Sequence, residues 1–215
     1  FEQVNLPAGA DPTGPPPTAV RIAATNVSIE IGPVGAPIVA LRQGQGLFLI
    51  TEAGMAGTVS GTVELAVPGL TSDQFSLQGD FGLAINTSPN AVSQQFELAG
   101  ETLTLNVAAG PYIRIEGNDV VVRLLGQRLS GNFSFEKSGD AIKFALSDVA
   151  LGLGDGATDF VTLTGGEGAF IITPSDQAVP NSGGLAGRIG GTVNVNIPGV
   201  EVEGTFTLSI NGTTA

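Results

Sequence analysis

The sequence contains no cysteine and no histidine, and these two absences exclude much of the chemistry that proteins commonly use. Without cysteine there are no disulfide bonds and no thiolate ligands for a metal ion. Without histidine the chain lacks the commonest general base and the commonest ligand of transition metals. The fold must therefore rest on a hydrophobic core, which a chain of 215 residues is long enough to form.

Charge is scarce and mostly of one sign. Only 13% of the residues are charged, and 20 acidic residues against 8 basic ones give a net charge of −12. Nucleic acids and anionic membrane surfaces would be repelled, so neither is expected as a partner. Glycine, threonine, serine and asparagine fill the polar positions instead, which is typical of β-rich proteins outside the cytosol. We therefore expect an extracellular or cell-surface location.

Long hydrophobic runs and aromatic girdles are also absent. No apolar segment approaches the ~20 residues of a membrane-spanning helix. Transmembrane β-proteins carry aromatic residues at both membrane interfaces, whereas this chain has no tryptophan and one tyrosine. We expect that the chain does not span a membrane.

Apolar and polar residues alternate with a period of two along most of the chain. In VSGTVELAV, residues 59–67, the odd-numbered positions are apolar or glycine and most even-numbered positions are polar. This pattern predicts an antiparallel sheet with one apolar face. We expect an all-β, largely antiparallel meander of roughly twelve to fifteen long, strongly coiled strands, in a β-sandwich or barrel-like repeat. Tight turns are predicted at Gly117–Asn118 and Gly126–Gln127.

Glycine recurs on the apolar side of these strands. A glycine inside a strand weakens it, so repeated use indicates a sharp bend or coil of the sheet or the close approach of a facing backbone. The positions are Gly61, Gly79, Gly131, Gly191 and Gly204.

Four segments of the chain recur in the same order, which indicates an internal tandem duplication. Residues 20–32 match 142–154, residues 39–51 match 161–173, residues 57–69 match 187–199, and residues 75–87 match 200–212. In addition, FEQ at residues 1–3 is similar to FEK at 135–137.

The duplication divides the chain into three parts. Residues 1–87 are a first, partial repeat (part B), residues 88–134 are part A of the unit, and residues 135–215 are a second copy of part B. The chain starts and stops out of phase with its repeat, so we interpret it as a window on a longer array of units of roughly 125 residues. The alternative is one domain with an old duplication and an unrelated middle.

The recurring strand form G-[TND]-[VF]-x-[LF], the Pro-Gly stops and the Thr/Asn-rich composition carry a resemblance to known proteins. The chain resembles the tandem β-repeat regions of very large bacterial surface or secreted proteins, which are fibre- or adhesin-like. The resemblance implies a surface-exposed structural or adhesive role and brings no catalytic residues with it.

Paired carboxylates are the only catalytic groups that this composition leaves open. The acids of one copy mostly meet other residues in the second copy, which favours solvated surface positions over a catalytic pair. Glu30 matches Gly152, Glu64 matches Asn194, Asp80 matches Thr205, and only Glu2 and Glu136 match each other. We therefore do not expect an enzyme.

Calcium is the one cofactor that the acidic composition suggests. Asp148, Asp155 and Asp159 form the best local cluster, although they lack the spacing of a known calcium loop. This makes them a weak calcium candidate, and no other cofactor is expected. Asn86 and Asn211 lie in N-x-S/T sequons at matching ends of the two copies, and would be the sites to watch for glycosylation.

We expect a structural repeat segment of an extracellular fibre, sheath or giant surface protein, in which β-strand pairing joins adjacent copies of the repeat or protomer. The alternative is an adhesin domain that binds a carbohydrate or a surface such as a cell-surface glycan, with Tyr112 as its only tyrosine. The residues expected at the assembly junction are Phe1, Glu2, Gln3, Ser209, Ile210 and Asn211.

Overall fold

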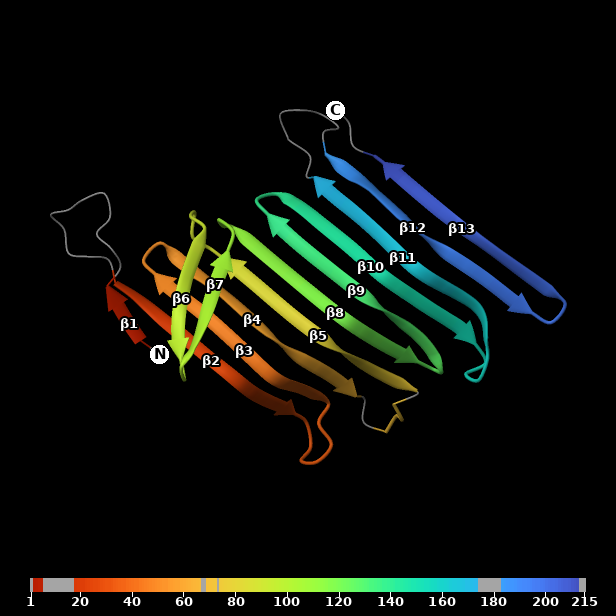
Figure 1. Ribbon diagram of the computed structural model, residues 1–215, viewed down its shortest axis with the longest axis horizontal. Helices are drawn as coiled ribbons and strands as arrows, with labels where there is room; N and C mark the ends of the chain where they lie inside the picture. The colour runs from red at the N-terminus through yellow and green to blue at the C-terminus, as the bar shows by residue number, and fades with distance from the viewer. Residues whose placement is uncertain (1, 6–17, 67–68, 73, 174–182, 213–215) are drawn as a thin grey trace.

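The computed structural model describes residues 2–5, 18–66, 69–72, 74–173 and 183–212, so Phe1 of the predicted junction lies outside it. These residues form thirteen β-strands and no helix. Eleven strands make one antiparallel sheet, and the other two form a separate hairpin (Figure 1). The all-β antiparallel meander predicted from the alternating pattern is confirmed.

The large sheet runs through β1-β2-β3-β4-β5-β8-β9-β10-β11-β12-β13. Its strands are β1 (Glu2–Asn5), β2 (Thr18–Ile31), β3 (Val39–Thr51), β4 (Gly54–Ala66), β5 (Phe75–Asn86), β8 (Tyr112–Leu124), β9 (Gln127–Ser138), β10 (Ala141–Gly154), β11 (Asp159–Thr173), β12 (Gly184–Ile197) and β13 (Val200–Asn211). The sheet is open, with β1 and β13 at its two edges, so the barrel-like closure that we considered does not occur.

The hairpin of β6 (Val92–Leu98) and β7 (Glu101–Val107) leaves the sheet between β5 and β8 and lies across β2, β4 and β5 (Figure 1). Phe96, Leu105 and Val107 of the hairpin pack there against Leu47 and Leu49 of β3. Leu105 is fully buried. The hairpin and the sheet beneath it form the main core of the described residues.

The two faces of the large sheet differ in polarity. Because residues opposite each other on neighbouring strands share a face, the register assigns each side chain to one side. One face, here called the apolar face, carries the rows of valine, leucine, isoleucine and phenylalanine. In the described part of the chain, the hairpin covers the other, polar face, and no layer covers the apolar one. Phe206 is 40% exposed there, and Leu129 is 43% exposed.

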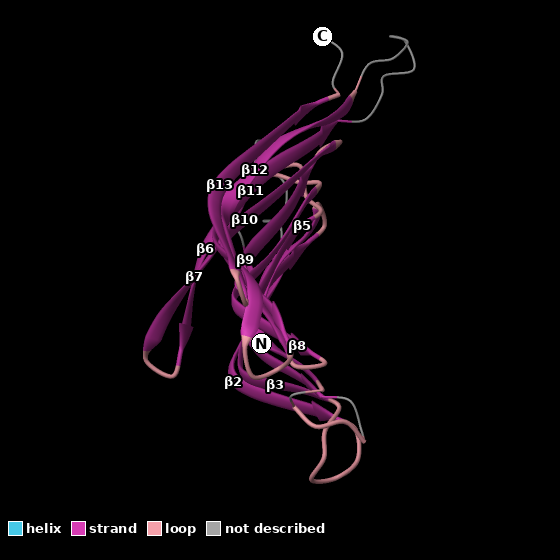
Figure 2. Cartoon of the chain, turned by 90° about the vertical axis from the view of Figure 1, so that its right-hand side faces the viewer, coloured by secondary structure: helices cyan, strands magenta, loops and turns pink. Residues whose placement is uncertain are grey.

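The sheet is strongly coiled (Figure 2), and β-bulges occur at regular places in it. Asn26 in β2 and Asp148 in β10 have positive φ at register shifts against the following strand, and Gln43 in β3 is similar. Such bulges bend a strand and increase its twist. They therefore contribute to the coiling that the glycine pattern predicted.

The turn predicted at Gly117–Asn118 is wrong, because a β-bulge occurs there instead. Gly117 and Asn118 lie inside β8, where Asp119 at φ 50° forms a bulge opposite β9 and the strand continues. A residue with positive φ serves a bulge as well as a turn. The second predicted turn exists, with Leu125 and Gly126 as the residues that link β8 to β9.

The two groups β2–β5 and β10–β13 pair with the same register. A row of opposite residues crosses the first group as Arg21, Leu49, Ala56 and Asn86. The aligned row in the second group is Lys143, Ile171, Ala186 and Asn211. The bulges at Asn26 and Asp148 are aligned too. The sheet continues without a break between the groups, and residues 134 and 135, where we divided the sequence, both lie inside β9.

Candidate assembly surfaces

The edge strand β13 has one strand partner, β12, among the residues that the structure describes. All of its described side chains are exposed, whereas the aligned strand β5 is half-buried between β4 and β8. Val202 is 56% exposed and Leu208 is 53% exposed. An uncovered apolar edge strand is a template for pairing with another chain.

Two aligned glycines show what β13 lacks. A methyl group on Gly79 of β5 would lie 2.9 Å from Cγ2 and 3.0 Å from Cα of Val120, because β8 lies alongside. A methyl group on Gly204 of β13 would meet no atom within 4 Å. The apolar face therefore has an empty space over Gly204 of β13. The equivalent space over Gly79 of β5 is filled by Val120 of the next strand.

This glycine pairing is general on the apolar face. A methyl group on Gly61 would lie 2.6 Å from Cδ1 of Leu41, and one on Gly191 would lie 2.8 Å from Cδ1 of Leu163. The atoms that approach these glycines belong to side chains and backbone of the adjacent strand in the same sheet, and not to a facing backbone as predicted.

The opposite edge of the sheet is also incompletely paired. β1 pairs with β2 only from Thr18 to Arg21, and Ile22–Ile31 have no strand on that side in the described part. The aligned strand β10 pairs with β9 from Ala141 to Gly152. In the described part, β2 therefore has no neighbouring segment equivalent to the first two thirds of β9, which pairs with β10.

The structure places the predicted junction residues at the two edges. Glu2 and Gln3 lie on β1, opposite Arg21 and Val20. Ser209, Ile210 and Asn211 lie at the end of β13, opposite Arg188, Gly187 and Ala186. Within one molecule the two groups are separated by the whole width of the sheet (Figure 1).

The hairpin is fixed to the polar face by a small set of side chains. A guanidinium nitrogen of Arg21 donates to Oε1 of Gln94 at 2.7 Å, and the guanidinium lies 5.7 Å from the centre of the Phe96 ring. The base of the hairpin is held by Asn86, which is 1% exposed. Its Nδ2 donates to the carbonyls of Asn90 and Ala108 at 2.8 and 2.7 Å. This buried use of the amide does not suit a glycosylation site at Asn86.

The aligned place in the second half is an open groove of about 620 Å³. Lys143, Ile171 and Ala186 line it, and they align with Arg21, Leu49 and Ala56 under the hairpin. Leu49 is 4% exposed and Ile171 is 36% exposed. Sequence reasoning missed this groove because it did not separate the hairpin from the sheet. The signal was the shortness of residues 92–107, which lack the longer alternation of their neighbours.

A polar cluster lies at one side of the groove. Nζ of Lys143 is 3.0 Å from Oε1 of Glu136, and the hydroxyl of Tyr112 donates to Oε2 of the same carboxylate at 3.2 Å. The hydrogen bond from Lys143 holds the pKa of Glu136 below its ordinary value. Burial raises the pKa of Tyr112. Tyr112 is 8% exposed, so it does not offer the open aromatic surface that the adhesin alternative needs.

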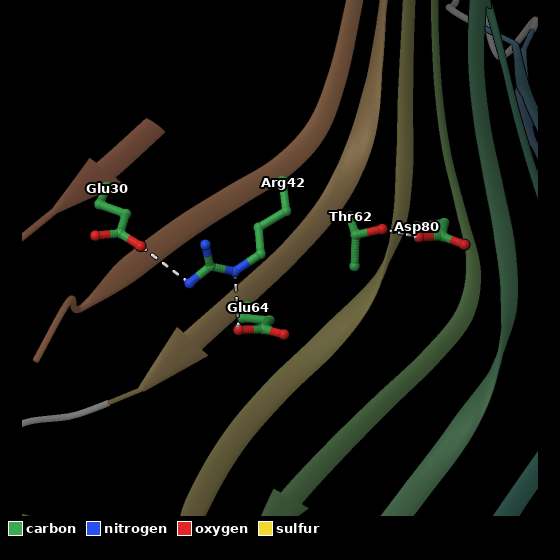
Figure 3. Close-up of polar contacts among 5 residues, drawn as sticks. All are labelled: Glu30, Arg42, Thr62, Glu64 and Asp80. Carbon is green, nitrogen blue, oxygen red and sulfur yellow. Dashed lines mark hydrogen bonds and ion pairs between the residues drawn. The ribbon is translucent and has the colours of Figure 1, made fainter. Parts of the chain in front are cut away.

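The acids on the polar face of the first half contact residues on neighbouring strands (Figure 3). Arg42 of β3 bridges Glu30 of β2 at 3.0 Å and Glu64 of β4 at 3.9 Å. Oγ1 of Thr62 donates to Oδ1 of Asp80 at 2.6 Å. These contacts tie adjacent strands together across the sheet.

The three aspartates of the calcium candidate do not form one cluster. Asp148 accepts from Nδ2 of Asn132 at 3.1 Å. Asp155 accepts from the backbone amides of Ala157 and Thr158, which lower the pKa of its carboxyl. Among the described residues, no three acidic side chains come together in a way that could hold a metal ion.

Comparison of the chain with protein-family models, curated proteins and solved structures found no match. The described part of the chain has no helix with the length and hydropathy that crossing a bilayer requires.

Proposed function

We propose that this chain is a structural repeat segment of an extracellular fibre, sheath or large surface protein, and that neighbouring units join by β-strand pairing. The observation that carries the proposal is the open space over Gly204, where the aligned Gly79 has Val120 of β8 against it. A strand placed beside β13 would fill this space and pair the exposed edge. Strand addition of this kind uses main-chain hydrogen bonds for affinity and side-chain pockets for register.

Two further observations support the proposal. The register of β2–β5 recurs in β10–β13, as expected if the chain is built from copies of one unit. The apolar face of the sheet is uncovered along its length in the described residues, and lone soluble proteins rarely expose apolar patches larger than a few hundred Å². The low content of charged residues, with glycine, threonine, serine and asparagine at the polar positions, supports the extracellular location.

Sedimentation velocity of the isolated chain over a range of concentrations tests the proposal. We expect self-association that increases with concentration, together with filaments in electron micrographs of the native material. Val202→Lys places a charge on the exposed edge and is expected to keep the chain monomeric, because charged edge residues prevent strand pairing. Val34→Lys is the matched control, since Val34 is fully exposed in the β2–β3 loop. A chain that stays monomeric at every concentration would contradict the proposal.

A second candidate function is a binding module, and the open groove of the second half favours it. The groove has an apolar floor with Arg114, Glu136, Lys143 and Arg188 around it, and its volume lies in the range of small-molecule sites. A glycan array with the chain and with Arg188→Ala tests this candidate. Binding that the substitution abolishes would support it.

A further inference from the structure

The two incomplete edges of the sheet complement each other in sequence and in shape. The strand that β2 lacks is the counterpart of β9, in which Leu129, Gly131, Phe133 and Phe135 point to the apolar face. β13 carries the same spacing of residue types, with Val202, Gly204, Phe206 and Leu208 on its apolar face. β13 therefore has the residue pattern of the strand that is missing beside β2.

One valine and one glycine show the fit most directly. Val149 of β10 lies between two glycines: a methyl group on Gly131 would be 3.1 Å from its Cγ2, and one on Gly166 would be 2.8 Å from its Cβ. The aligned Val27 of β2 lies against Gly44 of β3. A methyl group on Gly44 would be 3.3 Å from Cβ of Val27. On its other side, the described residues hold no counterpart of Gly131.

Gly204 shows the opposite deficiency. It is a glycine on the apolar face with nothing packed over it, while Val27 is a valine on the same face without a second glycine. We propose that β13 of one copy of this chain pairs with Ile22–Ile31 of β2 in a second copy, with Val27 packed over Gly204. This inference deepens the proposed function by naming the partner strand and its register.

The register follows from the β9–β10 pair. Phe133 lies opposite Leu146 and Leu129 lies opposite Leu151. Transferred to the two edges, Phe206 lies opposite Ala24 and Val202 lies opposite Ile29 of the next copy. The bulge at Asn26 then takes the place of the bulge at Asp148.

The direction of the strands also agrees with this arrangement. Every neighbour in the sheet is antiparallel, so β13 runs opposite to β2, and a copy shifted along the sheet meets β13 with an antiparallel strand and with its apolar face on the same side. In the proposed register Leu208 lies opposite Ile22, and Ser209, Ile210 and Asn211 reach the Arg21, Val20 and Ala19 positions that β1 occupies. The junction therefore requires β1 to leave β2, or the last three residues of β13 to turn away from it. A head-to-tail contact of this kind does not close on itself unless its rotation forms a ring, so it produces open filaments.

Disulfide trapping tests the register, and the absence of native cysteine makes each introduced thiol unique. Four single variants are mixed in pairs under mild oxidation: Ala24→Cys or Ile29→Cys with Phe206→Cys or Val202→Cys. A disulfide needs Cβ atoms about 4 Å apart, so we expect the matched pairs 24/206 and 29/202 to form heterodimers at least about tenfold faster than the exchanged pairs 24/202 and 29/206.

The outcomes separate this inference from the proposed function. Faster trapping of both matched pairs would establish the register. Equal trapping of matched and exchanged pairs, or no trapping in a chain that sedimentation shows to be associated, would overturn the register and leave strand-mediated assembly intact. A chain that never associates would overturn both.

Discussion

At the scale of single residues, glycine has two different meanings on this sheet. Gly79 is needed because Val120 of the next strand occupies the place of its side chain, whereas the aligned Gly204 has free space around it. The difference lies in the neighbouring strand. The same substitution should therefore have opposite effects at the two positions.

Gly79→Ala is expected to destabilise the chain by about 1–3 kcal/mol, because overpacking forces the neighbouring strand to shift. Gly204→Ala is expected to leave stability unchanged or raise it by up to about 1 kcal/mol, since alanine loses less conformational entropy than glycine in a strand. Urea unfolding of dilute monomer measures both. The account is contradicted if the two alanine variants lose the same free energy of unfolding.

Glu136 provides a residue-scale prediction that depends on pH. Its pKa is lowered in the folded state, chiefly by Lys143, so its contribution to stability is present above the ordinary value of 4.5 and is lost as the pH falls through the folded pKa. Lys143 is 58% exposed, which limits the contribution of the ion pair to roughly 0.5 kcal/mol.

Glu136→Gln removes the charge and keeps an acceptor for the Tyr112 hydroxyl. We expect the variant to be slightly less stable than the natural chain at pH 7, with a smaller difference at pH 3, as measured by urea unfolding. An equal loss at both pH values would show that the charge is not responsible.

At the scale of elements, alternation with a period of two was sufficient to predict the strands, because one face of the sheet is apolar and the other polar. It was not sufficient to place them. Residues 92–107 alternate over shorter stretches than their neighbours, and they leave the sheet and cover Leu47 and Leu49. The bulge at Asp119 was predicted as a turn because glycine and asparagine suit both structures.

The candidate sites were predictable to different degrees. The phase of the repeat predicted junction residues at the two ends of the chain, and the structure puts those that it describes on the two edge strands. The gap over Gly204 could not be predicted from the sequence, since only the neighbouring strand distinguishes it from Gly79. The groove could not be predicted either, because its shape depends on where the hairpin lies.

The hairpin makes an element-scale prediction with matched cysteines. Leu49→Cys lies under the hairpin and Ile171→Cys lies at the aligned position in the open groove. We expect a thiol reagent to label Ile171→Cys at least about tenfold faster, since the reaction requires access to the thiolate. Ile172→Cys, on the apolar face, serves as an exposed reference. Equal labelling at positions 49 and 171 would mean that the hairpin does not protect the first half.

At the scale of the whole molecule, the sheet has two open edges and an uncovered apolar face in the part of the chain that the structure describes, and the full chain has a net charge of −12. The edges and the apolar face favour association, while the like charges of two copies repel each other. Salt screens such repulsion over a distance of about 8 Å at physiological ionic strength, so assembly should be studied there and not in dilute buffer. The open edges and the uncovered face are what we expect if the chain is, as proposed, a segment of a larger array.

The central claim is that units join by pairing along β13, and amide hydrogen exchange in dilute and assembled samples tests it directly. About half of the amides of an edge strand point away from its single partner and exchange rapidly. We predict that the outward amides between Val200 and Ile210 become protected on assembly, while the amides of β3 exchange as before. Assembled material in which these amides of β13 still exchange at the monomer rate would contradict the account.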